Sequence, residues 1–189
     1  MTEQIAEASP RPRARITGAV YLLYFLTAIS AEVLVGKSRP ALYDAVSLIG
    51  YAFYIALALL LYFLFKPVNN GLSMLAAFLN LAGCADDILR LFNIAPEKIK
   101  SLVFFALYCL LIGYLILRST FLPRILGVLM VFAGLGWLIY WIPLANHLTT
   151  YLKALGFLAE AALMLWLLVM GVNEQRWKEQ AGAELLKST

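Results

Sequence analysis

Charged residues are scarce in this sequence. Asp, Glu, Lys and Arg make up 14% of its 189 residues, whereas hydrophobic residues make up 63%. Soluble domains average about 25% charged and about 45–50% apolar residues. A core of the size that such a chain can build cannot hold this excess of apolar side chains, so lipid must be the solvent for much of the surface. The composition therefore excludes an ordinary soluble domain and predicts an integral membrane protein.

Cysteine and histidine are also rare, with two cysteines and one histidine. Cys84 and Cys109 lie in different apolar runs without CxxC spacing, which argues against a disulfide framework or a thiolate metal site. We expect both to be small buried apolar residues. His147 alone cannot supply paired axial ligands for haem, and no lysine lies deep in an apolar run to hold retinal. No cofactor is expected.

Catalytic motifs are absent as well. The sequence contains no HExxH, GxSxG, P-loop or GxGxxG pattern. We therefore favour a protein without catalytic activity. A membrane enzyme that acts on a lipid is a weaker hypothesis, which ranks third after the two given at the end of this section. The net charge is +4, but the basic residues stand at the ends of apolar runs rather than on one soluble face. This pattern argues against nucleic acid and favours anionic lipid headgroups as the partner.

Long apolar runs are what the sequence has in place of these features. A helix needs about 20 apolar residues to cross a bilayer. Six runs approach or reach this length, at 16–35, 45–65, 72–92, 101–117, 125–142 and 151–172. We predict an all-α polytopic membrane protein, a bundle of six transmembrane helices at 15–172, with an N-terminal tail at 1–14 and a C-terminal tail at 173–189.

Six spans place both termini on the same side of the membrane. Cytoplasmic loops of membrane proteins carry an excess of Lys and Arg. The loops opposite the termini carry Lys37, Arg39, Lys98, Lys100 and Lys153, whereas the terminal side carries Arg11, Arg13, Arg15, Lys66, Arg118, Arg124, Arg176, Lys178 and Lys187. We therefore predict that both termini are cytoplasmic.

A few charges lie inside the predicted spans. The run NLAGCADDILR at 80–90 holds Asp86, Asp87 and Arg90, while Glu32 and Glu160 lie in the first and last spans. Each such group costs roughly 2.5–3.5 kcal/mol at the centre of a membrane helix, so it usually pairs, lines a cavity or does chemistry. The predicted topology places all five in the outer half of the membrane. We expect them to converge.

Helical spacing adds detail to the third span. Asn80, Gly83, Asp87 and Arg90 form one stripe, and Asp86 can reach Arg90 at i to i+4. The five charges then support two interpretations of equal weight. They are either a structural network that fixes helix order or a site for a small solute or ion. A metal site that adds His147 to the acids is less favoured, because ligand spacing is absent.

Several ordered motifs resemble a known family. They are RSTFLPRILG at 118–127, preceded by GYLI at 113–116, and then GLG at 134–136, LAE at 158–160 and LWLLVMG at 165–171. Together they resemble the bacterial six-span membrane family called domain of unknown function number 4386. Residues 15–32 and 62–69 also resemble that family's first span and first short turn. Its acids match Glu32 and Glu160, and the pair Asp86 and Asp87 matches its acidic position in span three less cleanly.

The resemblance implies a multi-pass protein of the bacterial plasma membrane and no established activity. Our leading hypothesis is a protein that binds or translocates a small solute or ion through Glu32, Asp86, Asp87, Arg90 and Glu160. The alternative is a non-catalytic accessory or assembly subunit whose partners are other membrane subunits.

Overall fold

The computed structural model describes residues 9–36, 38–92, 94, 101–139 and 148–188. Within these ranges the chain is helical, which confirms the all-α class. The elements are α1 (Pro10–Ile29), the π-helical segment η1 (Ser30–Val35), α2 (Pro40–Phe65), α3 (Asn70–Leu91), α4 (Ser101–Arg118), α5 (Arg124–Ile139), α6 (Thr149–Val169) and α7 (Glu174–Ser188).

The helix starts follow from local sequence. Pro10 and Pro40 open α1 and α2, because proline lacks only an N–H that has no partner in the first turn. Residues 10–14, expected in the N-terminal tail, are thus part of α1. Asn69 caps α3 by accepting a 2.9 Å hydrogen bond from the Leu72 N–H. Asn173 does the same for Arg176 at 3.1 Å, so the expected C-terminal tail contains a capped helix.

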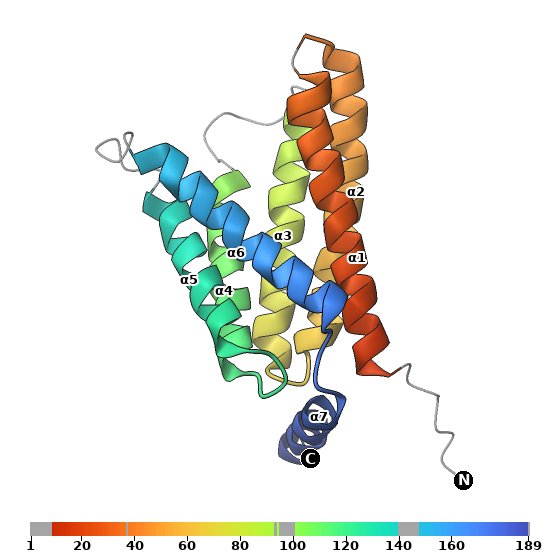
Figure 1. Ribbon diagram of the computed structural model, residues 1–189, viewed down its shortest axis with the longest axis vertical. Coiled ribbons are helices and arrows are strands. Elements are labelled where there is room, and N and C mark those ends of the chain that lie inside the picture. Colours follow the sequence, from red (N-terminus) through yellow and green to blue (C-terminus); the bar gives the residue numbers. More distant parts are fainter. Residues whose placement is uncertain (1–8, 37, 93, 95–100, 140–147, 189) are drawn as a thin grey trace.

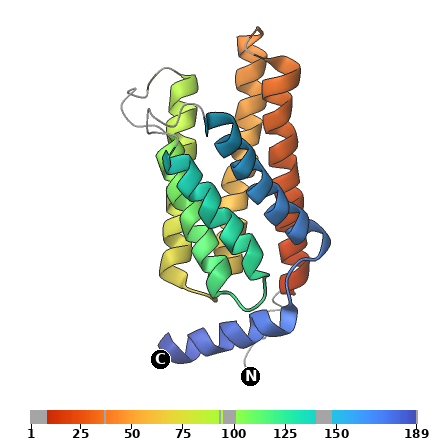
Figure 2. The same ribbon diagram turned by 60° about the vertical axis from the view of Figure 1, so that its left-hand side comes forward.

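The first six helices form a closed ring. Each helix packs mainly against its neighbours in the chain, and α6 closes the ring against α1. The ribbon views show α1 to α6 running along the long axis or obliquely to it, with α7 lying across the end where α1 begins and α6 finishes (Figures 1 and 2). Because α6 packs against α1, residues from the two ends of the chain face the same interior.

Glycines let neighbouring helices approach closely. A Cβ on Gly113 of α4 would lie 2.9 Å from the Gly127 carbonyl oxygen of α5, and a Cβ on Gly127 would lie 2.8 Å from the Gly113 oxygen. The two backbones are therefore in direct contact. Small residues at helix crossings are typical of membrane bundles, where packing rather than hydrophobic burial drives association.

Five helices are long and apolar enough to cross a membrane. They are α1 with η1, α2, α3, α4 and α6, whereas α5 is a shorter apolar helix within the described residues. Residues 140–142, which we assigned to the fifth span, lie outside the described residues. Large apolar side chains such as Phe63, Phe78 and Leu158 are more than half exposed on the outside of the ring. The length and surface of these helices indicate a multi-pass membrane protein.

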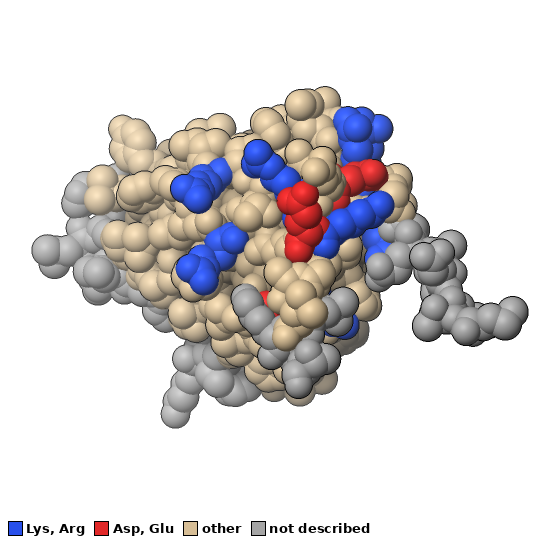
Figure 3. Space-filling model, turned by 90° about the horizontal axis from the view of Figure 1, so that it is seen from below, with Lys and Arg blue, Asp and Glu red and all other residues tan. Residues whose placement is uncertain are grey.

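Helix α7 is hydrogen-bonded to the end of α2 and to the turn between α4 and α5. The Trp177 indole donates a 3.0 Å hydrogen bond to the Leu64 carbonyl, and the Gln180 side chain accepts from the Thr120 N–H at 3.0 Å. Viewed from this end, Lys and Arg side chains are spread over the surface with a few acidic residues among them (Figure 3). This end carries α7 together with the turn between α2 and α3 and the turn between α4 and α5.

Candidate functional site

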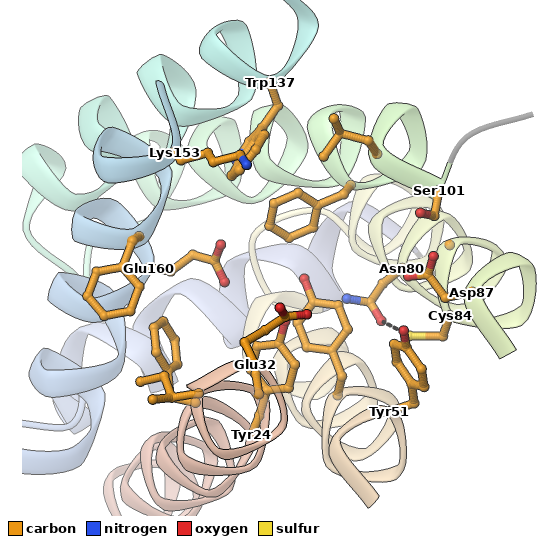
Figure 4. A pocket seen from close by; sticks show the side chains of 18 of the residues that line it. Tyr24, Glu32, Tyr51, Asn80, Cys84, Asp87, Ser101, Trp137, Lys153 and Glu160 are labelled. Carbon is orange, nitrogen blue, oxygen red and sulfur yellow. Dashed lines mark hydrogen bonds between the residues drawn. The ribbon is translucent and has the colours of Figure 1, made fainter. Parts of the chain in front are cut away.

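A cavity of about 520 Å³ lies inside the ring, in the half away from α7. Its walls come from the last turns of α1, from η1, from the middle of α2 and from the middle and later turns of α3. The start of α4, the end of α5 and the first half and middle of α6 complete them. Figure 4 shows its lining side chains from close by. The charged and polar ones are Glu32, Asn80, Cys84, Asp87, Ser101, Lys153 and Glu160.

Glu160 projects into this cavity from α6 (Figure 4). It is 6% exposed, and its carboxylate accepts a 2.7 Å hydrogen bond from the Tyr21 hydroxyl of α1. Gly156, one turn earlier, leaves room for Trp137 of α5, because a Cβ there would lie 2.6 Å from the indole ring. Glu160 therefore has an aromatic neighbourhood and one hydrogen bond that crosses from α6 to α1.

The stripe predicted for α3 faces the same cavity. Asn80, Gly83 and Asp87 all line it, together with Cys84. The Asn80 side-chain oxygen accepts a 3.6 Å hydrogen bond from the Cys84 thiol. Figure 4 places Asp87 beside Ser101 at the start of α4. Helical periodicity thus found three residues that share one wall.

Glu32 lies on η1 and is exposed. It lines the cavity, and it accepts a hydrogen bond from the Tyr43 hydroxyl of α2. Short π-helical segments inside helices occur frequently at functional sites. The carboxylates of Glu32 and Glu160 point into the same space in Figure 4.

Asp86 and Arg90 lie beside the site and do not line it. The Arg90 Nε atom is 2.9 Å from an Asp86 carboxylate oxygen, and Nη2 is 3.4 Å from the other. This confirms the predicted i to i+4 pair. The structure therefore divides the expected group of five: Glu32, Asp87 and Glu160 border the cavity, and Asp86 with Arg90 form an ion pair on α3.

Sequence reasoning missed Lys153 and most of the aromatic lining. We counted Lys153 with the loops, but α6 begins at Thr149 and the residue lines the cavity. Its spacing of two helical turns before Glu160 could have placed both on one face. Seven aromatic residues also line the cavity: Tyr24, Phe25, Tyr51, Tyr54, Phe105, Trp137 and Phe157.

Two buried polar groups belong to residues of the cavity wall. Within the described part of the chain, the Tyr54 hydroxyl and the Asn80 side-chain NH2 have no hydrogen-bond partner. Their residues are 7% and 2% exposed. Leaving such a group unpaired costs about 1–3 kcal/mol, and each exception calls for an explanation.

The three carboxylates are not arranged as a metal site. Among the described residues, no three His, Cys, Asp or Glu side chains are grouped so that they could hold one metal ion. His147, the fourth ligand of the less favoured metal hypothesis, lies outside those residues. The acids therefore border a common volume without meeting at one point within it.

Parts of the sequence are similar to known proteins. Residues 98–171 match the family model for the Domain of unknown function (DUF4386). The resemblance noted from the motifs is thus confirmed over α4, α5 and α6. The DUF4386 match includes Lys153 and Glu160, whereas Glu32 and Asp87 lie outside it.

One relative is described as "Uncharacterized protein" and comes from Archaeoglobus fulgidus. It is 28% identical over 148 residues, which cover 70% of this chain and 86% of that protein. No solved structure matches the chain.

Proposed function

We propose that this protein binds or translocates a small solute or ion in the cavity of the helix ring. Glu32, Asp87 and Glu160 would contact the ligand, and the Asp86–Arg90 pair would hold the end of α3 in place beside them. The observation that carries the proposal is a cavity bordered by three carboxylates, in whose wall two buried polar groups have no hydrogen-bond partner among the described residues.

The free-energy cost of placing these polar groups inside a membrane protein is the reason to assign a function to the cavity. Carboxylates and unpaired polar groups inside a membrane protein are expensive and tend to mark substrate or ion pathways. A purely structural network would be expected to pair these groups with one another. The Asp86–Arg90 pair does so, at 2.9 Å, whereas the Tyr54 hydroxyl and the Asn80 NH2 have no hydrogen-bond partner within the described ranges.

The proposal includes a topology. All six helices α1 to α6 would cross a bacterial plasma membrane, with both termini and α7 in the cytoplasm. The 16 residues of α5 extend about 24 Å at 1.5 Å per residue, which is less than the roughly 30 Å thickness of the hydrocarbon core. The cavity would then lie in the outer half of the membrane.

Water access to the cavity tests the proposal. Cysteine is introduced at Ala28, which lines the cavity, in a Cys84→Ala, Cys109→Ala background. The purified protein in lipid nanodiscs is then treated with a charged methanethiosulfonate reagent. We expect Ala28→Cys to react rapidly, because a solute-binding cavity must admit polar molecules.

Two alanines provide matched controls. Ala106 of α4 is fully buried in the helix packing, and Ala85 of α3 is exposed on the outside of the ring without lining the cavity. Neither Ala106→Cys nor Ala85→Cys should react, because packed protein and lipid both exclude the charged reagent. If Ala28→Cys reacts no faster than Ala106→Cys, the solute site is refuted, and the accessory role with structural charges is favoured.

A further inference from the structure

We propose that the ligand is a small organic cation, an ammonium group attached to an apolar or aromatic body. This inference rests on the proposed function, because it names the class of solute that the same cavity would take. Two features of the cavity wall support the inference: the aromatic side chains and the carboxylates.

Aromatic rings form much of the wall. Tyr24 and Tyr54 are stacked with ring centroids 4.4 Å apart, while the centroids of Phe105 and Trp137 are 5.7 Å apart with the rings edge to face. The rings come from α1, α2, α4 and α5, so they surround the space rather than cover one side. The face of an aromatic ring attracts ammonium groups, and cages of such rings are a known way of binding quaternary amines.

Charge at the lining favours a positive guest. Among the described lining residues, three side chains are carboxylates and one, Lys153, is basic. Lys153 is exposed and stands seven residues before Glu160, which is about 10 Å along α6. Figure 4 shows the Lys153 side-chain nitrogen beside Trp137, whereas Glu160 is buried.

Glu160 is the natural partner for the ammonium group. Tyr21 donates to only one of its carboxylate oxygens, and a carboxylate can accept about four hydrogen bonds. An ammonium group placed there would add a charge-assisted hydrogen bond.

Size argues for an organic rather than an inorganic cation. Within the described chain no three acids are grouped to hold one metal ion, yet the cavity measures about 520 Å³. Sites for small organic ligands have volumes of about 300–1,000 Å³ and mostly apolar walls. A ligand with an apolar body would fill the space between the aromatic side chains, while its charged group contacts one carboxylate.

Three probes of matched shape test the charge preference at neutral pH: 2-phenylethylammonium, 2-phenylethanol and phenylacetate. Binding to the protein in nanodiscs is measured by isothermal titration calorimetry. We expect the cation to bind roughly tenfold more tightly than the alcohol, and phenylacetate to bind most weakly.

Substitutions in the cavity test whether the preference for the cation arises there. Glu160→Gln should lower the affinity for the cation roughly tenfold and leave that for the alcohol unchanged, because only the cation uses the charge. Asp87→Asn is a second such variant if Glu160→Gln does not fold. Glu179→Gln removes an exposed acid on α7 and should change neither affinity. Ala28→Phe, which fills the cavity, should abolish binding of all three probes.

Other outcomes separate this inference from the proposed function. Equal or tighter binding of the alcohol or of phenylacetate, abolished by Ala28→Phe, would refute the cation and retain a solute site. Absence of binding by all three probes, with Ala28→Cys still labelled, would also refute the cation alone. Absence of both binding and labelling would refute both proposals.

Discussion

At the scale of single residues, the hydrogen bond between Tyr21 and Glu160 joins the first and last helices of the ring. Both side chains are buried, with exposures of 0% and 6%, and the O–O distance is 2.7 Å. A buried carboxylate without partners is strongly unfavourable, so one well-placed donor matters more here than at a surface. This bond also sets the direction in which the carboxylate enters the cavity.

Replacement of Tyr21 by Phe should therefore destabilise the protein. The loss of the donor leaves a buried acceptor unpaired, which should lower the free energy of unfolding by about 1–3 kcal/mol. The measurement is the shift in thermal unfolding midpoint in detergent, followed by circular dichroism. Tyr62→Phe is the matched control, because its hydroxyl bonds to Asn70 at an exposed position and should contribute little. Equal shifts in the two variants would contradict this account.

At the scale of helices, the α4–α5 contact depends on the absence of side chains at the crossing. A Cβ on Gly113 would lie 2.8 Å from the Val131 backbone nitrogen and 2.9 Å from the Gly127 oxygen. Backbone atoms cannot rotate away as a side chain can, so the helices themselves must separate. The same two helices supply Phe105 and Trp137 to the cavity wall.

Gly113→Ala should thus cost stability despite the higher helix propensity of alanine. Overpacking of this kind typically costs about 1–3 kcal/mol, more than the roughly 1 kcal/mol that alanine gains over glycine in a helix. Gly182→Ala in α7 is the control, because a Cβ there meets nothing within 4 Å and should be neutral or stabilising. Thermal unfolding in detergent again gives the measurement. A stabilised Gly113→Ala variant would show that the helices are not in contact there.

At the scale of the whole molecule, α6 closes the ring against α1, and α7 lies across the end where both termini of the ring meet (Figure 2). Arg15 of α1 reaches the last turn of α6, where it donates a 3.1 Å hydrogen bond to the Val169 carbonyl. A cation at this position also complements the negative end of the α6 dipole. Arg15, which lies at the end of the molecule that carries α7, therefore helps to hold α1 against α6.

Topology reporters test the orientation of the whole molecule. A green fluorescent protein fused after Thr189 should fluoresce when the chain is expressed in a bacterial host, and alkaline phosphatase at the same position should be inactive. Both results follow if the arginine-rich end stays in the cytoplasm. The same reporters placed after Ser38, between η1 and α2, should give the opposite pattern. Active phosphatase after Thr189 would contradict the assigned orientation.

Some features followed from the sequence alone. Scarce charge and long apolar runs were enough to predict an all-α membrane protein, because they depend only on composition and local periodicity. The Asp86–Arg90 pair and the α3 stripe were likewise predictable, since their geometry is set within one helix. The start of α1 at Pro10 and the helix at Glu174–Ser188 were not predicted, because apolar runs mark membrane spans and these segments are polar.

The tertiary structure alone decided which residues share the cavity. Ring closure brings Glu160 to Tyr21 across 139 positions of sequence, and no local pattern specifies such a contact. The aromatic wall became visible only when α1 to α6 were placed around one space, because its rings come from different helices. Periodicity identifies the face of a helix, but the neighbour that this face meets depends on packing between helices that are distant in the chain.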